Sequence, residues 1–167
     1  INKALGATTA SAFTIDQEQY SRRQCLRIFG VLKSAKETPE DCLKTVRNLI
    51  TEVGLDIPDV TLDRAHRIGN ARGDKPPAIV VKFTNFRHRT ALYKKRKVIR
   101  DRCKYSIQLD LTRERLALLN EARALLSSKS TSRDDFVFAD INCVVTAKVG
   151  QRFHKISSIE DLEGLFS

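Results

Sequence analysis

Hydrophobic residues recur along the chain in two patterns, one with the period of a helix and one that alternates as in a strand. The helical period is clearest in residues 38–54, where Thr38 suits the N-cap, Pro39 the first turn and Gly54 the C-terminal end. A second helix is predicted after Asn85, through a strongly basic stretch. Short apolar and β-branched runs predict four strands, at residues 25–31, 60–69, 78–83 and 106–111.

The predicted order is strand, helix, strand, strand, helix, strand, and the expected fold class is α+β. This βαββαβ order is the ferredoxin-like arrangement, with two helices on one face of a four-stranded antiparallel sheet. A small α-β-β-α unit is predicted to follow, with a helix after Thr112, a hairpin within residues 136–156 and a short helix after Ser158. We therefore expect three segments: a leader at 1–19, a βαββαβ domain at 20–111 and a C-terminal domain at 112–167.

Positive charge is concentrated in one part of the chain. The 167 residues have a formal net charge of +10, and residues 81 to 104 hold ten Lys and Arg against one acid, Asp101. This zone of 24 residues therefore has a charge of +9. A polyphosphate backbone favours such a zone, because each neutralised phosphate releases condensed counterions. The alternatives are a solvated helix face and an anionic membrane surface, although few large apolar groups accompany the cations for insertion.

Signals for membranes, metals and catalysis are weak. No stretch approaches the ~20 apolar residues of a membrane span, and residues 1–13 lack the pattern of a signal peptide, so we expect a cytoplasmic or nuclear protein. The four cysteines are widely spaced, with no Cys-x-x-Cys and no zinc-finger histidine spacing. The sequence has no Gly-x-Ser-x-Gly, no phosphate-binding glycine loop and no acidic cluster for paired magnesium ions. We expect no enzyme, no cofactor, no metal and no membrane partner.

The βαββαβ order suggests comparison with the RNA recognition motif, in which the first and third strands present aromatic rings that stack bases. Here Arg27 occupies the usual outward aromatic position of the first strand. The outward residues of the third strand are predicted to be Ala78, Val80 and Lys82, which leaves Phe29 as the ring on that face. Such a sheet cannot read RNA in the usual way.

Four segments in order carry a resemblance to a known family. They are YSRRQCLRIFGV at 20–31, DRAHRIG at 63–69, AIVVKF at Ala78–Phe83 with a basic helix after it, and Asp-Leu-Thr at 110–112 leading into a helix. Over residues 19–166 the chain resembles the nucleic-acid-binding first-reading-frame protein of LINE-type (non-LTR) retrotransposons.

The resemblance implies a noncanonical RNA recognition motif followed by a small C-terminal domain, with single-stranded RNA or DNA held in the cleft between them. It implies an RNA-packaging and strand-annealing chaperone in a cytoplasmic ribonucleoprotein, with the nucleus as a second location. It also implies a coiled coil that makes the full-length protein a homotrimer, of which residues 15–20 could at most be the end. Six residues fall where the family keeps basic residues: Arg22, Arg23, Arg27, Arg64, Arg67 and Lys82.

Strand alternation divides these candidates. Arg64 and Arg67 differ by three positions, so on one strand they point to opposite faces, and at most one shares a face with Arg27. We expect the other at the rim or in a salt bridge. Arg22 and Arg23 are expected to be exposed, either as contacts or as a flexible basic arm.

Charge adds further candidates. Lys94, Lys95 and Arg96 belong to the basic run, and Arg152 and Lys155 on the last predicted strand either line the cleft or are plain surface charge. Phe153, between them, is expected in the core. The alternative function is a protein-interaction module with a ferredoxin-like fold and no nucleic-acid role, in which the charge serves solubility only.

Overall fold

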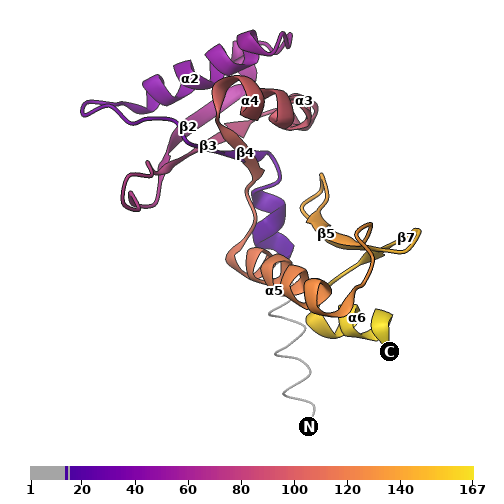
Figure 1. Cartoon of the computed structure of the whole chain (residues 1–167). Coiled ribbons are helices and arrows are strands. Elements are labelled where there is room, and N and C mark those ends of the chain that lie inside the picture. Colours follow the sequence, from indigo (N-terminus) through magenta and orange to yellow (C-terminus); the bar gives the residue numbers. More distant parts are fainter. Residues whose placement is uncertain (1–13, 15) are drawn as a thin grey trace. The chain divides into compact units, whose positions relative to one another are not determined.

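The computed structural model of the chain describes residue 14 and residues 16–167 (Figure 1). It is an α+β structure with a four-stranded antiparallel sheet and a three-stranded antiparallel sheet. The chain divides into two compact units, which are described separately below. One is Arg23–Asp110, and the other combines the described residues up to Arg22 with Leu111–Ser167.

The unit Arg23–Asp110 contains the predicted order of elements. Its strands pair in the order β2-β3-β1-β4, every pair being antiparallel. Helices α2, α3 and α4 lie on the same side of this sheet (Figure 1). In chain order its elements are β1 Cys25–Phe29, α2 Pro39–Glu52, η1 Asp59–Thr61, β2 Leu62–Ile68, β3 Ala78–Phe83, α3 Phe86–Lys94, α4 Arg96–Cys103 and β4 Ser106–Leu109.

Helix α2 begins where its capping residues predict. The Thr38 hydroxyl accepts a hydrogen bond from the Asp41 N–H, and the Asp41 carboxylate accepts one from the Thr38 N–H. These hydrogen bonds, the backbone one first, lower the pKa of Asp41. The helix ends before Gly54, whose φ of +69° suits glycine. Its buried side faces the sheet, and the core beneath α2, α3 and α4 includes Val46, Leu49, Leu92, Ile99, Leu26, Ile28, Ile79, Val81 and Phe83.

The second predicted helix is interrupted. Asn85 caps α3 as expected, its side chain accepting from the Arg87 N–H at 2.9 Å. Lys95, with φ −86° and ψ 5°, then ends α3 and precedes α4. Lys94 and Lys97 lie three positions apart across this point, and like charges at that spacing oppose a continuous helix. Leu92 and Ile99, one on each helix, are both fully buried.

The other unit contains three strands, so the predicted α-β-β-α order is wrong. The predicted strand after residue 136 turns back at Asp140, whose Oδ1 accepts from the N–H groups of Asn142 and Val144. This aspartate-centred turn, with Cys143 at φ +63°, separates two strands where one was expected. The elements are α5 Arg113–Lys129, β5 Phe136–Ala139, β6 Val145–Val149, β7 Arg152–Lys155, α6 Ile159–Glu163 and η2 Gly164–Phe166.

A second core lies between α5, α6 and one face of this small sheet. It contains Leu119, Ala122, Leu126, Val137, Val145, Ala147, Ile156 and Leu162. Phe153, expected in the core, is instead 63% exposed. It lies opposite Lys148, and the alternation of β7 places it on the face away from this core.

Part of the predicted leader belongs to this unit. Residues 16–21 are helical, and Gln19 is buried with its Oε1 accepting from the Thr112 N–H at 2.8 Å. Arg115 of α5 forms an ion pair with Asp16 at 2.7 Å. Residues 1–13 and 15, which include the start of the predicted coiled-coil end, lie outside the described residues. No helix in the described part of the chain is both long and apolar enough to cross a bilayer.

Candidate nucleic-acid interface

One face of the four-stranded sheet bears no helix of its own unit, and we call it the open face. Cross-strand partners in an antiparallel sheet share a face. Arg27 lies opposite Val80 on one side and Gln108 on the other, while Lys82 lies opposite Arg64. The alternation of each strand then assigns eleven residues to the open face: Cys25, Arg27, Phe29, Arg64, His66, Ile68, Ala78, Val80, Lys82, Ser106 and Gln108.

This assignment confirms the outward set predicted for the third strand, namely Ala78, Val80 and Lys82. It also confirms Arg27 as an outward residue and Phe29 as the one phenyl ring that β1 to β4 place there. His66 and Gln108, both exposed, also belong to this face, and neither is among the residues predicted from the sequence. Two-residue alternation along β2 and β4 is the signal that could have found them.

Arg64 and Lys82 place like charges directly opposite each other on neighbouring strands. Arg64 is exposed, and the Lys82 Nζ lies 3.9 Å from Asp63 Oδ2, a loose and partly exposed pair. Like charges at directly opposed positions destabilise a sheet. An anion bound over them would reverse the sign of this interaction.

Arg27 is held by an acid at the end of the sheet. Its Nε donates to Asp110 Oδ1 at 2.7 Å, and the Asp110 side chain is only 8% exposed. The pair is neutral, so Arg27 adds little net positive charge to the open face. Its planar guanidinium, fixed by this pair, is nevertheless suited to stacking on a base.

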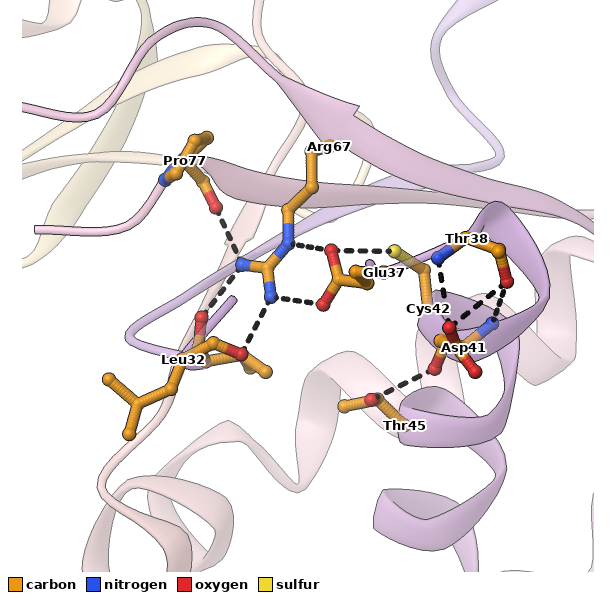
Figure 2. Close-up of polar contacts among 9 residues, drawn as sticks. Leu32, Glu37, Thr38, Asp41, Cys42, Thr45, Arg67 and Pro77 are labelled. Carbon is orange, nitrogen blue, oxygen red and sulfur yellow. Dashed lines mark hydrogen bonds and ion pairs between the residues drawn. The ribbon is translucent and has the colours of Figure 1, made fainter. Parts of the chain in front are cut away.

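Arg67 is on the opposite face of the same strand, as the spacing predicts, and its guanidinium is saturated (Figure 2). Nε and Nη2 donate to the two carboxylate oxygens of Glu37 at 2.7 and 2.8 Å. The remaining N–H groups donate to the carbonyls of Val31, Leu32 and Pro77 at 2.7 to 2.9 Å. These contacts use all five donors of an arginine. We therefore leave Arg67 out of the interface.

The two partners of this ion pair shift each other's pKa. Hydrogen bonds from Arg67 lower the pKa of Glu37, and the same bonds raise the pKa of Arg67. The Cys42 thiol, 3.6 Å from Glu37, has a pKa raised chiefly by burial (Figure 2). Glu37 and Arg67 are 8% and 9% exposed, which makes them a nearly buried pair.

The basic run surrounds a hollow of about 450 Å³, which we call the basic hollow. It is lined by Lys94, Arg96, Lys97 and Arg100 of α3 and α4 and by Ser106 and Ile107 of β4. Lys95, the third candidate of this run, is half-buried at the break between the helices. Lys97 and Arg100 were counted in the basic zone but not named as contacts, because only the helix break and β4 bring them around one hollow.

One cation of the basic run, Arg89, lies in the protein interior. Arg89 is fully buried, with its guanidinium 4.9 Å from the Phe86 ring centroid and 5.9 Å from that of Tyr93. The Arg96 guanidinium carbon lies 4.3 Å from the Tyr93 ring centroid. These cation–π contacts show that part of the positive charge holds α3 together.

Arg22 and Arg23 are half-buried, so the expectation that both are exposed is wrong. Arg22 Nη2 pairs with Glu18 at 2.6 Å, and Nη1 donates to the Leu111 carbonyl at 3.5 Å. These contacts tie Arg22 to the unit that contains α5. Glu18 lies four residues before Arg22, in the short helix at residues 16–21.

Arg152 and Lys155 are both exposed and lie on opposite faces of β7, as their spacing predicts. They belong to the unit that contains α5. The cleft between two domains that the resemblance implies stays a prediction.

Net charge differs sharply between the units. Arg23–Asp110 contains twenty Lys and Arg against ten Asp and Glu, which equals the +10 of the whole chain. The remaining residues contain ten Lys and Arg and ten Asp and Glu, so their net charge is zero. The unit with the open face and the basic hollow thus holds all the net charge.

Among residues 14 and 16–167, no group of three or more His, Cys, Asp or Glu side chains is arranged to hold a metal ion. Comparison of the sequence with protein-family models finds no match, and comparison with curated proteins finds none either. The family resemblance therefore rests on the four sequence segments alone.

Proposed function

We propose that this protein binds single-stranded RNA or DNA through the open face of its four-stranded sheet and the basic hollow at the β4 edge of that sheet. In this proposal, Arg23–Asp110 is a noncanonical RNA recognition motif of ferredoxin-like topology, and the α5–α6 region is a C-terminal domain. The protein acts as the LINE-type first-reading-frame proteins do, packaging RNA and promoting strand annealing. The full-length protein is a trimer through a preceding coiled coil.

The observation that carries the proposal is the pair Arg64 and Lys82. Their side chains share a face without helices, directly opposite each other, in the unit that holds the whole net charge. Repulsion between these two cations destabilises the folded sheet, whereas a bound phosphate backbone would attract both of them.

A single strand fits this face better than a duplex does. The open face is a sheet surface with a planar guanidinium at Arg27, an imidazole at His66 and a ring at Phe29, all of which suit stacking on exposed bases. Backbone contacts from cations and stacking from planar groups are tolerant of sequence. We therefore expect weak discrimination among base sequences.

The test is a titration of the chain with a labelled oligothymidylate of ~20 nucleotides at several salt concentrations. Log affinity should fall with log salt at about −0.7 for each phosphate contact, and about five contacts give a slope near −3.5. A slope shallower than about −1.5 would mean that the basic surface is not the site. Absence of binding at low salt would favour the protein-interaction module.

A further inference from the structure

A group of exposed rings lies on the three-stranded sheet, which the proposed interface does not use. Strand register places six residues on the face away from α5, in two rows across β5, β6 and β7. The first row is Phe136, Lys148 and Phe153, and the second is Phe138, Thr146 and Lys155. We call this surface the phenylalanine face.

The rings form a continuous group. The centroids of Phe136 and Phe138 are 5.5 Å apart with the planes tilted by 44°, and Phe138 meets Phe153 edge to face at 6.2 Å. Phe136 and Phe153 are 45% and 63% exposed, whereas Phe138 between them is half-buried. Phe138 therefore supports two outer rings that remain open to solvent.

The core of this unit does not need these rings, because it lies on the other face of the sheet around Val137, Val145 and Ala147. Cross-strand aromatic contacts do stabilise sheets, which offers a purely structural role. That role does not require the two outer rings to be as exposed as they are. Contiguous exposed aromatic surface commonly marks a binding site.

The charges beside the rings are positive. Strands β5 to β7 contain Lys148, Arg152 and Lys155 and no Asp or Glu, although the unit as a whole is neutral. The Lys148 Nζ lies 5.5 Å from the Phe136 ring centroid, between the two outer rings in the register. The nearby Asp135 carboxylate already accepts from the Ser130 hydroxyl and the Gly150 N–H. A ligand with flat apolar groups and negative charge fits this surface.

From these contacts we propose that the phenylalanine face is a second contact site for single-stranded nucleic acid, in which unpaired bases stack on Phe136 and Phe153 while Lys148 and Lys155 meet the phosphates. The inference rests on the proposed function for its class of ligand, but on different residues in the other unit. It assigns base stacking to a part of the chain that has no net charge.

The test compares two probes of equal length and charge, an oligothymidylate and the same backbone with abasic sites. Replacing Phe136 and Phe153 by leucine keeps apolar volume but removes the ring faces. Each single change should weaken oligothymidylate binding about fivefold, and the pair should weaken it at least about tenfold. Abasic-probe binding and the salt slope should stay unchanged, because no cation is lost. Tyrosine at both positions should restore affinity.

Several results would overturn the inference. Leucine variants that bind oligothymidylate as tightly as the parent chain would remove the face from the interface. An equal loss for both probes would assign the effect to structure rather than stacking. A change of oligomeric mass in light scattering without a change of affinity would make the face a contact between copies.

The same measurements separate the two proposals. If the proposed function fails, the parent chain binds neither probe, whereas failure of this inference leaves salt-dependent binding intact. Should the leucine variants unfold, the parent chain can be photo-crosslinked to an oligonucleotide that contains 5-iodouracil. Adducts at Phe136 or Phe153 are expected, and crosslinking confined to Arg23–Asp110 would refute the site.

Discussion

Arg67 and Glu37 form a two-point ion pair in which Nε and Nη2 of the arginine meet both carboxylate oxygens, and the same guanidinium binds three backbone carbonyls. The pair joins β2 to the segment between β1 and α2 and to Pro77 ahead of β3 (Figure 2). Arg64, three residues earlier on β2, is exposed on the open face. Two arginines of one short motif thus have different surroundings, one exposed and one in a nearly buried ion pair.

Replacing Arg67 by alanine should lower the free energy of unfolding by about 3 kcal/mol, because it leaves a nearly buried carboxylate and three carbonyls without their donor. Arg64→Ala, as the matched control, should change it by no more than about 0.5 kcal/mol. Urea denaturation measures both. Arg67→Lys should not rescue stability, since one ammonium cannot reproduce the planar fork. Equal effects at the two positions would contradict the assignment.

The lowered pKa of Glu37 predicts a pH dependence of stability. A carboxyl whose folded pKa is below its ordinary value of 4.5 stabilises the fold above pH 4.5, and this stabilisation is lost as pH falls through the folded pKa. The difference in free energy of unfolding between the parent chain and Glu37→Gln should therefore be greatest near neutral pH and shrink on acidification. Denaturation at a series of pH values from about 6 to about 3 measures this difference. A difference that grows toward low pH would refute the prediction.

Replacing Arg64 and Lys82 together by alanine should weaken single-strand binding about tenfold at low salt and make the salt slope shallower by about 1.4, since two phosphate contacts are lost. Lys36 and Lys44, both exposed and lying before and on α2, offer a control with the same loss of charge. Lys36→Ala with Lys44→Ala should leave the slope nearly unchanged. Equal losses for the two double variants would show that only net charge matters.

A fragment limited to Arg23–Asp110 should fold, because it is a compact unit with its own core, and it retains the full +10. We expect it to bind a single strand at least about tenfold more weakly than the whole chain, which corresponds to about 1.4 kcal/mol. The loss comes from the missing phenylalanine face. Circular dichroism must first show that the fragment is folded. A folded fragment of undiminished affinity would confine the site to the first unit.

Local signals in the sequence were sufficient for much of the fold. Thr38 and Asn85 marked helix starts because a cap acts within three residues of itself. Alternation along β1 and β3 placed Arg27 and Lys82 on the outward face, because neighbouring residues of a strand point to opposite sides. This signal is local as well. The spacing of Arg64 and Arg67 correctly predicted that they lie on opposite faces. It did not predict which guanidinium has all its donors in hydrogen bonds.

The rest depended on residues far apart in the chain. The partners of Arg67 lie 30 to 36 residues away at Glu37, Leu32 and Val31, so only the packed fold shows that this arginine has no donor left for a ligand. The exposure of Phe153 depends on its pairing with Lys148 and on which face α5 covers. Through periodicity and capping, the sequence therefore determines which side of a helix or strand a residue occupies. Tertiary contacts decide whether that side becomes core, ion pair or open surface. Burial arises from segments that are far apart in the chain, and local patterns do not connect them.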